Sequence, residues 1–121
     1  METKKHVLGI GGLFFRSKDP KALSEWYNIH FDINDATSNN LWITEEGPTV
    51  FSPFKQDTDY FGSKEQMFMI NFRVHDLDGF IEKLKKAGVK IDDNRMNEPY
   101  GKFAWVYDQE GNKIELWEPV G

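Results

Sequence analysis

Residues 69–77 read Met-Ile-Asn-Phe-Arg-Val-His-Asp-Leu, an apolar run typical of a strand that ends in an aspartate and passes into a helical pattern. Residues 12–20, Gly-Leu-Phe-Phe-Arg-Ser-Lys-Asp-Pro, repeat this order, and 57 residues separate the two aspartates, Asp19 and Asp76. A pattern that recurs at a fixed spacing indicates two copies of one structural unit. We therefore expect two related halves within one domain.

Each aspartate opens a predicted helix, because its carboxylate can accept hydrogen bonds from the free N–H groups of the first turn and suits the positive end of the helix dipole. The second helix should end at Gly88, which can take a left-handed conformation. Its apolar stripe has three- and four-residue spacing: Leu77, Phe80, Ile81, Leu84 and Ala87. The first helix should end near His30 or Phe31, and one of its faces carries Ala22, Leu23, Trp26 and Tyr27.

Strand-like segments follow each predicted helix. In the second half they are residues 103–107 and 113–117, joined by a turn in which Gly111 supplies a positive φ. Their counterparts in the first half are residues 41–44 and 49–52. A shorter strand is expected in each half, around 33–36 and around 89–91.

These elements predict an α+β fold in a single domain over residues 1–121. Two tandem βαβββ modules, about 7–54 and about 67–121, are joined by a polar linker over about 55–66. They should form a curved mixed sheet shaped as a cup, with the helices on its convex face.

The alternation of strand side chains sorts the residues onto two faces. One face is uniformly apolar and should lie beneath the helices: Leu13, Phe15, Ile70, Phe72, Val74, Ala104, Val106, Ile114 and Leu116. The opposite face mixes aromatic, charged and amide side chains, which is typical of a binding surface. The alternative is a solvated or intersubunit sheet face. The predicted ligand-binding residues are Phe14, Arg16, Trp42, Phe51, Met69, Asn71, Arg73, Phe103, Trp105, Tyr107 and Trp117, with Lys113 and Glu115 on the same face.

Composition excludes several classes of partner. The net charge of −5 argues against nucleic acid and anionic membranes, which require a concentrated basic face. The N-terminal residues resemble neither a signal peptide nor a membrane span. No cysteine is present, so there is no disulfide or zinc–thiolate site, and a reducing compartment is allowed. We expect a cytoplasmic protein.

The duplicated order, together with residues 72–78 and 108–119, resembles the vicinal oxygen chelate (VOC) superfamily of glyoxalases, extradiol dioxygenases and bleomycin-resistance proteins. Residues 54–62 are similar to a small bacterial glyoxalase-like branch. The resemblance implies eight strands, paired modules and often a homodimer whose subunits share sheet contacts.

The resemblance also implies where a divalent metal would be held. Those positions fall at Gly12, at Thr49 or Phe51, at Met69 and at Glu115. Only Glu115 is a plausible ligand, because glycine and phenylalanine offer no side-chain donor and a thioether suits these ions poorly. We therefore predict no metal ligand set and no cofactor, with a divalent metal at Glu115 as the alternative.

Three functions follow. The first is a metal-free small-molecule-binding protein, in which arginines favour a carboxylate or phosphate and the aromatic rings a planar or sugar-like body. The second is a glyoxalase- or dioxygenase-like enzyme in which Glu115 is the catalytic base or a metal ligand. The alternative role for Glu115 is an ion pair with Arg73 or Lys113 on the sheet face. The third is an interaction module whose partner surface consists of Tyr60, Phe61 and Tyr100. The alternative is that these three residues only pack loops over the sheet edge.

Overall fold

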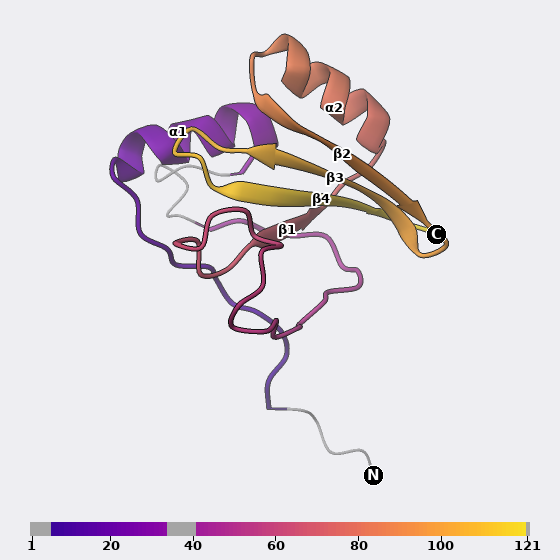
Figure 1. Cartoon of the computed structure of the whole chain (residues 1–121). Coiled ribbons are helices and arrows are strands. Elements are labelled where there is room, and N and C mark those ends of the chain that lie inside the picture. The colour runs from indigo at the N-terminus through magenta and orange to yellow at the C-terminus, as the bar shows by residue number, and fades with distance from the viewer. Residues whose placement is uncertain (1–5, 34–40, 121) are drawn as a thin grey trace.

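The computed structural model describes residues 6–33 and 41–120. Within these ranges the elements are α1 (Pro20–Phe31), β1 (Ile70–Arg73), α2 (Leu77–Lys86), β2 (Lys90–Glu98), β3 (Gly101–Tyr107) and β4 (Lys113–Pro119). The four strands form one sheet in the order β1-β4-β3-β2, in which β1 runs parallel to β4 and the other neighbours are antiparallel. Both helices lie on one side of this curved sheet (Figure 1). Neither helix of the described chain has the length and apolar character needed to cross a membrane.

The predicted helix caps are confirmed. A carboxylate oxygen of Asp19 accepts a hydrogen bond from the backbone N–H of Ala22 at 3.2 Å, and Asp76 does the same for Gly79 at 3.2 Å. Gly88 has a φ of +84°, the conformation that ends α2. The helices therefore begin where the sequence placed them because the local chemistry defines their ends.

The core lies between α2 and the sheet. The apolar stripe of α2 is buried against the strand face that the sequence assigned to the helices, and this cluster contains Leu77, Ile81, Leu84, Ala104, Val106, Ile114 and Leu116. Burying each large aliphatic side chain contributes about 1.5–3 kcal/mol. The expected face is thus confirmed for the second half of the chain.

Helix α1 packs beside α2 on the same sheet. The ring of Phe31 meets those of Phe72 and Phe80 edge-on, with centroids 5.2 and 5.5 Å away. The buried hydroxyl of Tyr27 donates to Asp108 at 2.7 Å, in the turn between β3 and β4. In the same turn, the carboxylate of Glu110 accepts hydrogen bonds from residues 17–19 at 2.8–3.0 Å. The first helix is therefore attached to the second half of the chain.

The second module is a complete βαβββ unit, from β1 through α2 to β4. The predicted pair at 103–107 and 113–117 is confirmed as β3 and β4, and Gly111 in their turn has a φ of +85°. The third strand, expected around 89–91, is much longer: β2 continues to Glu98 after a shift of register between Ile91 and Arg95. The full length of β2 is not predicted because its sequence is mostly polar, and a strand at the edge of a sheet needs little apolar patterning.

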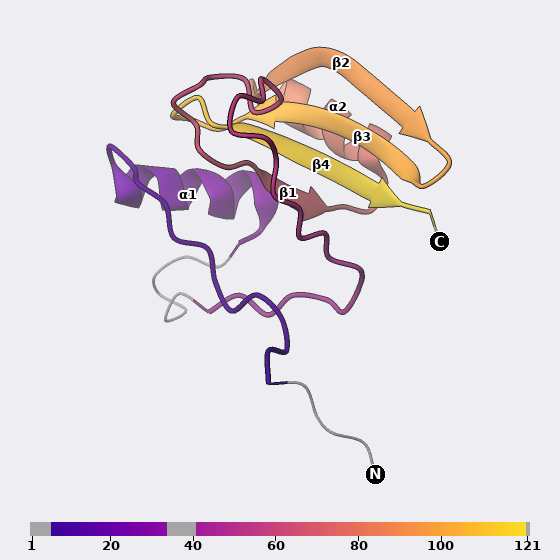
Figure 2. The ribbon, with the colours of Figure 1, turned by 60° about the horizontal axis from the view of Figure 1, so that its bottom comes forward.

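The first module is not confirmed as a second βαβββ unit. The strand expected ahead of Asp19 within residues 12–20 and those expected at 41–44 and 49–52 run without strand structure, and the expected strand at 33–36 lies mostly outside the described residues. A strand requires a neighbouring strand for its backbone groups, and these segments lie below the sheet without joining it (Figures 1 and 2). The prediction that Leu13 and Phe15 lie beneath a helix is wrong, because both side chains are exposed.

Candidate functional site

The sheet face turned away from the helices carries most of the residues predicted for the binding face. The register aligns Phe103 with Trp117, Trp105 with Glu115, and Tyr107 with Lys113 across β3 and β4. On the other side of β4, Asn71 aligns with Glu115 and Arg73 with Trp117. Paired residues point to the same side of a sheet, so these side chains form one continuous surface.

Glu115 lies at the centre of this surface and is 8% exposed. Its carboxylate accepts hydrogen bonds from the Tyr60 hydroxyl, from Asn71 Nδ2 at 2.7 Å and from Trp105 Nε1 at 3.1 Å. All three donors are neutral. Among the described residues no salt bridge joins Glu115 to Arg73 or Lys113, so the expected ion pair is replaced by a network of neutral donors.

The segment expected to be a linker, residues 55–66, folds back over this face and is bound to β4. The side-chain amide of Gln66 accepts from the backbone N–H of Lys113 at 2.8 Å and donates to its carbonyl at 2.9 Å. Lys113 Nζ donates in turn to the carbonyl oxygen of Tyr60 at 3.1 Å. Burial, and then the hydrogen bond to Glu115, raise the pKa of the Tyr60 hydroxyl far above its usual value. The segment is thus part of the site wall.

A pocket of about 310 Å³ opens between this segment and the sheet. Its lining consists of Asp59, Tyr60, Asn94, Trp105 and Lys113. The ammonium of Lys113 lies 5.6 Å from the ring centroid of Tyr60 and 5.7 Å from that of Trp105. The volume and the combination of rings with a few polar groups are typical of a site for a small ligand.

The far wall of the pocket is the irregular part of β2. Asp92 accepts hydrogen bonds from the backbone N–H and the side-chain amide of Asn94, both at 2.9 Å, and from the Tyr107 hydroxyl at 2.7 Å. The backbone bond from Asn94, followed by the Tyr107 bond, lowers the pKa of Asp92. Burial, and then the hydrogen bond to Asp92, raise the pKa of the Tyr107 hydroxyl to about 12. The shift in register therefore positions Asn94 at the pocket.

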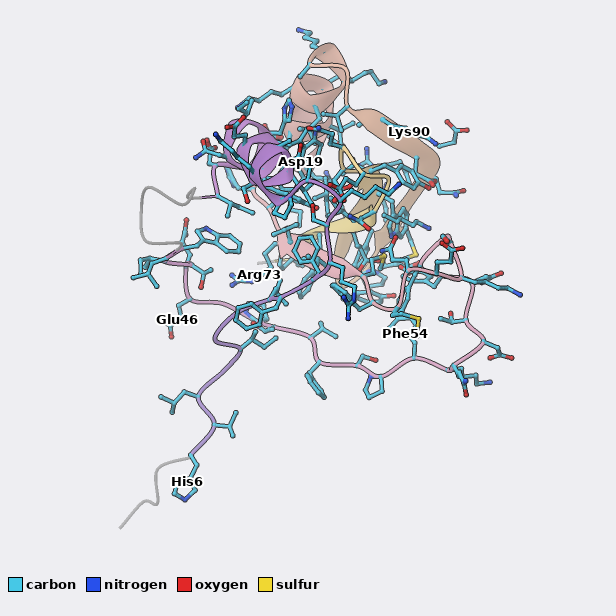
Figure 3. All side chains as sticks on the ribbon, turned by 90° about the vertical axis from the view of Figure 1, so that its left-hand side faces the viewer. His6, Asp19, Glu46, Phe54, Arg73 and Lys90 are labelled. Carbon is cyan, nitrogen blue, oxygen red and sulfur yellow. The ribbon has the colours of Figure 1, made fainter. Side chains whose placement is uncertain are left out.

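Several predicted residues on the sheet surface lie outside the pocket. Phe103 and Trp117 stack with centroids 6.1 Å apart and planes at 5°. Arg73 Nη2 donates to the carbonyl oxygen of Glu45 at 2.9 Å, on the side of the molecule where Glu46 is also seen (Figure 3). Met69 is half-buried just before β1. The structure brings four of the predicted residues together at the pocket. Trp105 lines it, and Asn71, Tyr107 and Glu115 belong to the hydrogen-bond networks that support it.

The first-half candidates do not join this group. Phe14, Arg16 and Phe51 are exposed, at 95% for Phe14 and 85% for Phe51. The ring of Trp42 lies 5.9 Å from that of Phe72, which packs against the core beneath the helices. Their assignment to the cup depended on first-half strands that the structure does not form.

The sequence does not assign Asp59, Tyr60 or Asn94 to a ligand-binding role, and it places Lys113 on the predicted binding face without naming it as a ligand-binding residue. Asp59 and Tyr60 lie in a segment interpreted as a linker, and Asn94 lies in a polar stretch with no motif. Tyr60 is expected only at a partner surface, but it is half-buried and its ring meets that of Trp105 edge-on at 6.1 Å, which matches the alternative of a loop packed on the sheet. The sequence signal for this segment is the aromatic pair Tyr60 and Phe61 within an otherwise polar loop.

The residues at the implied metal positions do not fit a divalent ion. The described chain holds no group of three or more His, Asp or Glu side chains that could bind a metal. Gly12 and Met69 supply no suitable oxygen or nitrogen, and both carboxylate oxygens of Glu115 already accept hydrogen bonds. His6 lies at the far end of the described N-terminal segment, well away from the sheet (Figure 3).

A larger hollow of about 460 Å³ lies on the helix side, between the end of α1 and the start of α2. Its lining includes Phe31, Asp32, His75, Asp76, Phe80 and Lys83. None of the predicted binding residues lines it. We therefore place the candidate site in the pocket on the sheet face.

Comparison with known proteins decides the family. The model of the Glyoxalase/Bleomycin resistance protein/Dioxygenase superfamily matches residues 9–116. The chain belongs to this superfamily. The resemblance seen in the sequence is thereby confirmed, and the α+β architecture with its curved sheet is consistent with the VOC fold.

Solved structures of this superfamily are similar to the chain. TnmS3, an antibiotic binding protein from Streptomyces sp. CB03234, matches with 22% identity and a TM-score of 0.50 over 86% of this chain and 88% of its own. A glyoxalase/bleomycin resistance protein from the same organism has 30% identity and a TM-score of 0.39 over 44% of this chain and 46% of its own. A superfamily member from Sphaerobacter thermophilus DSM 20745 has 26% identity and a TM-score of 0.38, and the match covers 40% of each chain. The chain thus spans less than half of the latter two, and no curated protein matches it.

Proposed function

We propose that this VOC protein binds a small molecule with a planar ring in the pocket on the sheet face, without the metal of its metal-dependent relatives. The observation that carries the proposal is the pocket wall formed by Tyr60 and Trp105, whose polar atoms are both held by Glu115. Rings that are fixed before the ligand arrives lose little conformational freedom on binding. Such rings favour a flat partner.

Binding without chemistry is favoured by the state of Glu115. A general base needs an oxygen within hydrogen-bonding reach of the substrate proton. Here the carboxylate is buried and its two oxygens accept three hydrogen bonds from protein groups. A glyoxalase- or dioxygenase-like reaction with Glu115 as the base would first require Tyr60 to leave it.

Thermal unfolding with a panel of one- to three-ring compounds tests this function. We expect at least one compound to raise the melting temperature of the native chain and of Trp26→Phe, which alters a ring on α1. The rise should be lost or strongly reduced in Trp105→Phe, which removes the indole but keeps a core ring. If no compound raises the melting temperature, or the rise is the same in Trp105→Phe, the proposal is wrong.

We also propose that the protein functions as a homodimer in the cytoplasm. Large apolar side chains in the first half are exposed, among them Leu8, Phe14, Ile43 and Phe51. Exposed apolar surface of this kind typically marks an interface, and a second copy can supply strand partners for residues 12–16 and 49–52, which carry no strand structure in the described chain. A monomer in light scattering at micromolar concentration would contradict the dimer. A chain without cysteine requires no oxidising compartment.

A further inference from the structure

The charges around the pocket are mostly negative. Asp59 lines it, Asp92 lies behind Asn94, and Glu115 lies behind Tyr60 and Trp105. One ammonium group, that of Lys113, lines it. Lys90 is directed instead onto the ring of Tyr107, with its Nζ 4.7 Å from the centroid.

The described hydrogen-bond donors to Glu115 and Asp92 are all neutral groups. Glu115 is bound by a hydroxyl, an indole N–H and an amide, while Asp92 is bound by a backbone N–H, an amide and a hydroxyl. These donors are neutral, so they orient the two carboxylates without adding positive charge to the pocket. Among the described residues, a ligand in the pocket therefore meets the carboxylate of Asp59 and the ammonium of Lys113, with the carboxylates of Asp92 and Glu115 one side chain further away.

The position of Lys113 shows that the pocket accommodates a cation. Its ammonium lies near the rings of both Tyr60 and Trp105 and donates to the Tyr60 carbonyl oxygen. Aromatic faces attract cations through the negative potential above the ring. Two rings and a carbonyl oxygen around an ammonium are the elements of a site for an organic cation, and part of that site is taken up by the protein's own side chain.

The arginines predicted for an anionic ligand do not contribute to this pocket. Arg16 is exposed, and Arg73 donates to the carbonyl of Glu45. An anion bound beside Lys113 would also lie next to the carboxylate of Asp59. The balance of charge thus opposes a carboxylate or phosphate ligand here.

We propose that the pocket selects a ligand that carries an amine beside a planar ring, with Asp59 as its counter-ion and Tyr60 and Trp105 as its aromatic walls. This inference rests on the proposed function, because it names the chemical class of the ligand bound there. Its geometric basis is the juxtaposition of Asp59, whose carboxylate has no bound partner among the described residues, with two fixed rings in a pocket of about 310 Å³.

Three ring-matched probes test the proposal: tryptamine, indole-3-acetamide and indole-3-acetate, which are cationic, neutral and anionic. Each is titrated into ¹⁵N-labelled protein at low salt while the indole N–H signal of Trp105 is followed. We expect tryptamine to bind about tenfold more tightly than indole-3-acetate, with indole-3-acetamide between them. The preference should shrink as salt is added, because added ions screen charge interactions.

Two variants locate the effect. Asp59→Asn should weaken the binding of tryptamine about three- to tenfold and leave the affinity for indole-3-acetamide unchanged. Asp57 is an exposed carboxylate of the same loop outside the pocket lining, so Asp57→Asn should change neither affinity. Tighter binding of indole-3-acetate, equal binding of all three probes, or no response at Trp105 would each overturn the proposed amine class. The proposed function would survive those results if another ring compound still stabilises the native chain through Trp105, and it fails if none does.

Discussion

The hydroxyl of Tyr60 donates a hydrogen bond to the carboxylate of Glu115, 55 residues further along the chain. This bond joins a loop to the buried centre of a sheet face, and Trp105 Nε1 donates to the same carboxylate oxygen. One carboxylate thereby sets the positions of both aromatic walls of the pocket. The network is the feature of the structure on which the proposed site depends most.

Replacing Tyr60 by Phe removes one of the three donors to Glu115. A buried carboxylate that loses a donor costs about 1–3 kcal/mol, so the free energy of unfolding in urea should fall by about that amount. Tyr100→Phe, which changes an exposed tyrosine, is the matched control and should alter stability by less than about 0.5 kcal/mol. Equal effects of the two variants would mean that the Tyr60 bond contributes nothing.

Glu115→Gln replaces a carboxylate oxygen by an amide nitrogen, which donates hydrogen bonds and accepts none. The nitrogen must then face one of the three donors, so we expect a loss of about 1–3 kcal/mol in the free energy of unfolding. Glu82→Gln, on the exposed side of α2, should have almost no effect. A Glu115→Gln protein as stable as the native chain would contradict the hydrogen-bond network, and unaltered turnover of any substrate found later would remove Glu115 as a catalytic base.

Alkaline pH should reveal the bond between Tyr107 and Asp92. The folded pKa of Tyr107 is raised to about 12 by burial and by this bond, whereas an unfolded tyrosine ionises near pH 10. Between these values the unfolded state holds fewer protons than the folded state, so stability falls as pH rises through this window. Below about pH 10 the contribution is fully present.

Unfolding in urea at about pH 9 and about pH 11 measures this effect. The native chain should lose more stability between the two than Tyr107→Phe, because the variant lacks the ionising group. Other tyrosines ionise in both proteins, so the difference between the variant and the native chain is the relevant quantity. The same loss in both proteins would show that Tyr107 does not titrate differently on folding.

Gly101, at the start of β3, has no room for a side chain. Its φ is +146°, and an added Cβ would lie 2.5 Å from Trp117 Nε1 and 2.7 Å from the carbonyl oxygen of Glu118. Gly101→Ala should therefore combine backbone strain with overpacking and cost about 3 kcal/mol or more. Gly111→Ala is the control: φ is +85° with no atom near the added Cβ, so about 1–2 kcal/mol is expected. Thermal unfolding followed by circular dichroism measures both variants. Equal losses of stability in Gly101→Ala and Gly111→Ala would contradict the close packing described at Gly101.

Local chemistry explains why the second module could be predicted. Asp76 and Gly88 define the ends of α2, and the alternation from Phe103 to Tyr107 assigns each side chain of β3 to a face. These signals depend on neighbours in sequence, so they are readable without the tertiary structure. The same reasoning located Asp19 as the cap of α1.

The rest depends on contacts that the sequence does not encode locally. Residues 41–44 have the composition of a strand, but they run without strand structure in the described chain, because strand formation depends on neighbouring strands that lie elsewhere in the sequence. Tyr60 belongs to the site only because Gln66 and Lys113 fold its loop back onto β4. Asn94 lies at the pocket because the strand register shifts between Ile91 and Arg95, and no pattern in the sequence predicts this shift.

The most direct test of the proposed site follows the four tryptophan indole signals of ¹⁵N-labelled protein while a ring compound that raises the melting temperature is added. Trp105 lines the pocket, whereas Trp26 lies on α1 and packs on the other side of the sheet. We predict that the Trp105 signal shifts in a saturable way while that of Trp26 stays in place. A saturable shift of Trp26 with an unchanged Trp105 would place the ligand elsewhere and contradict the central claim.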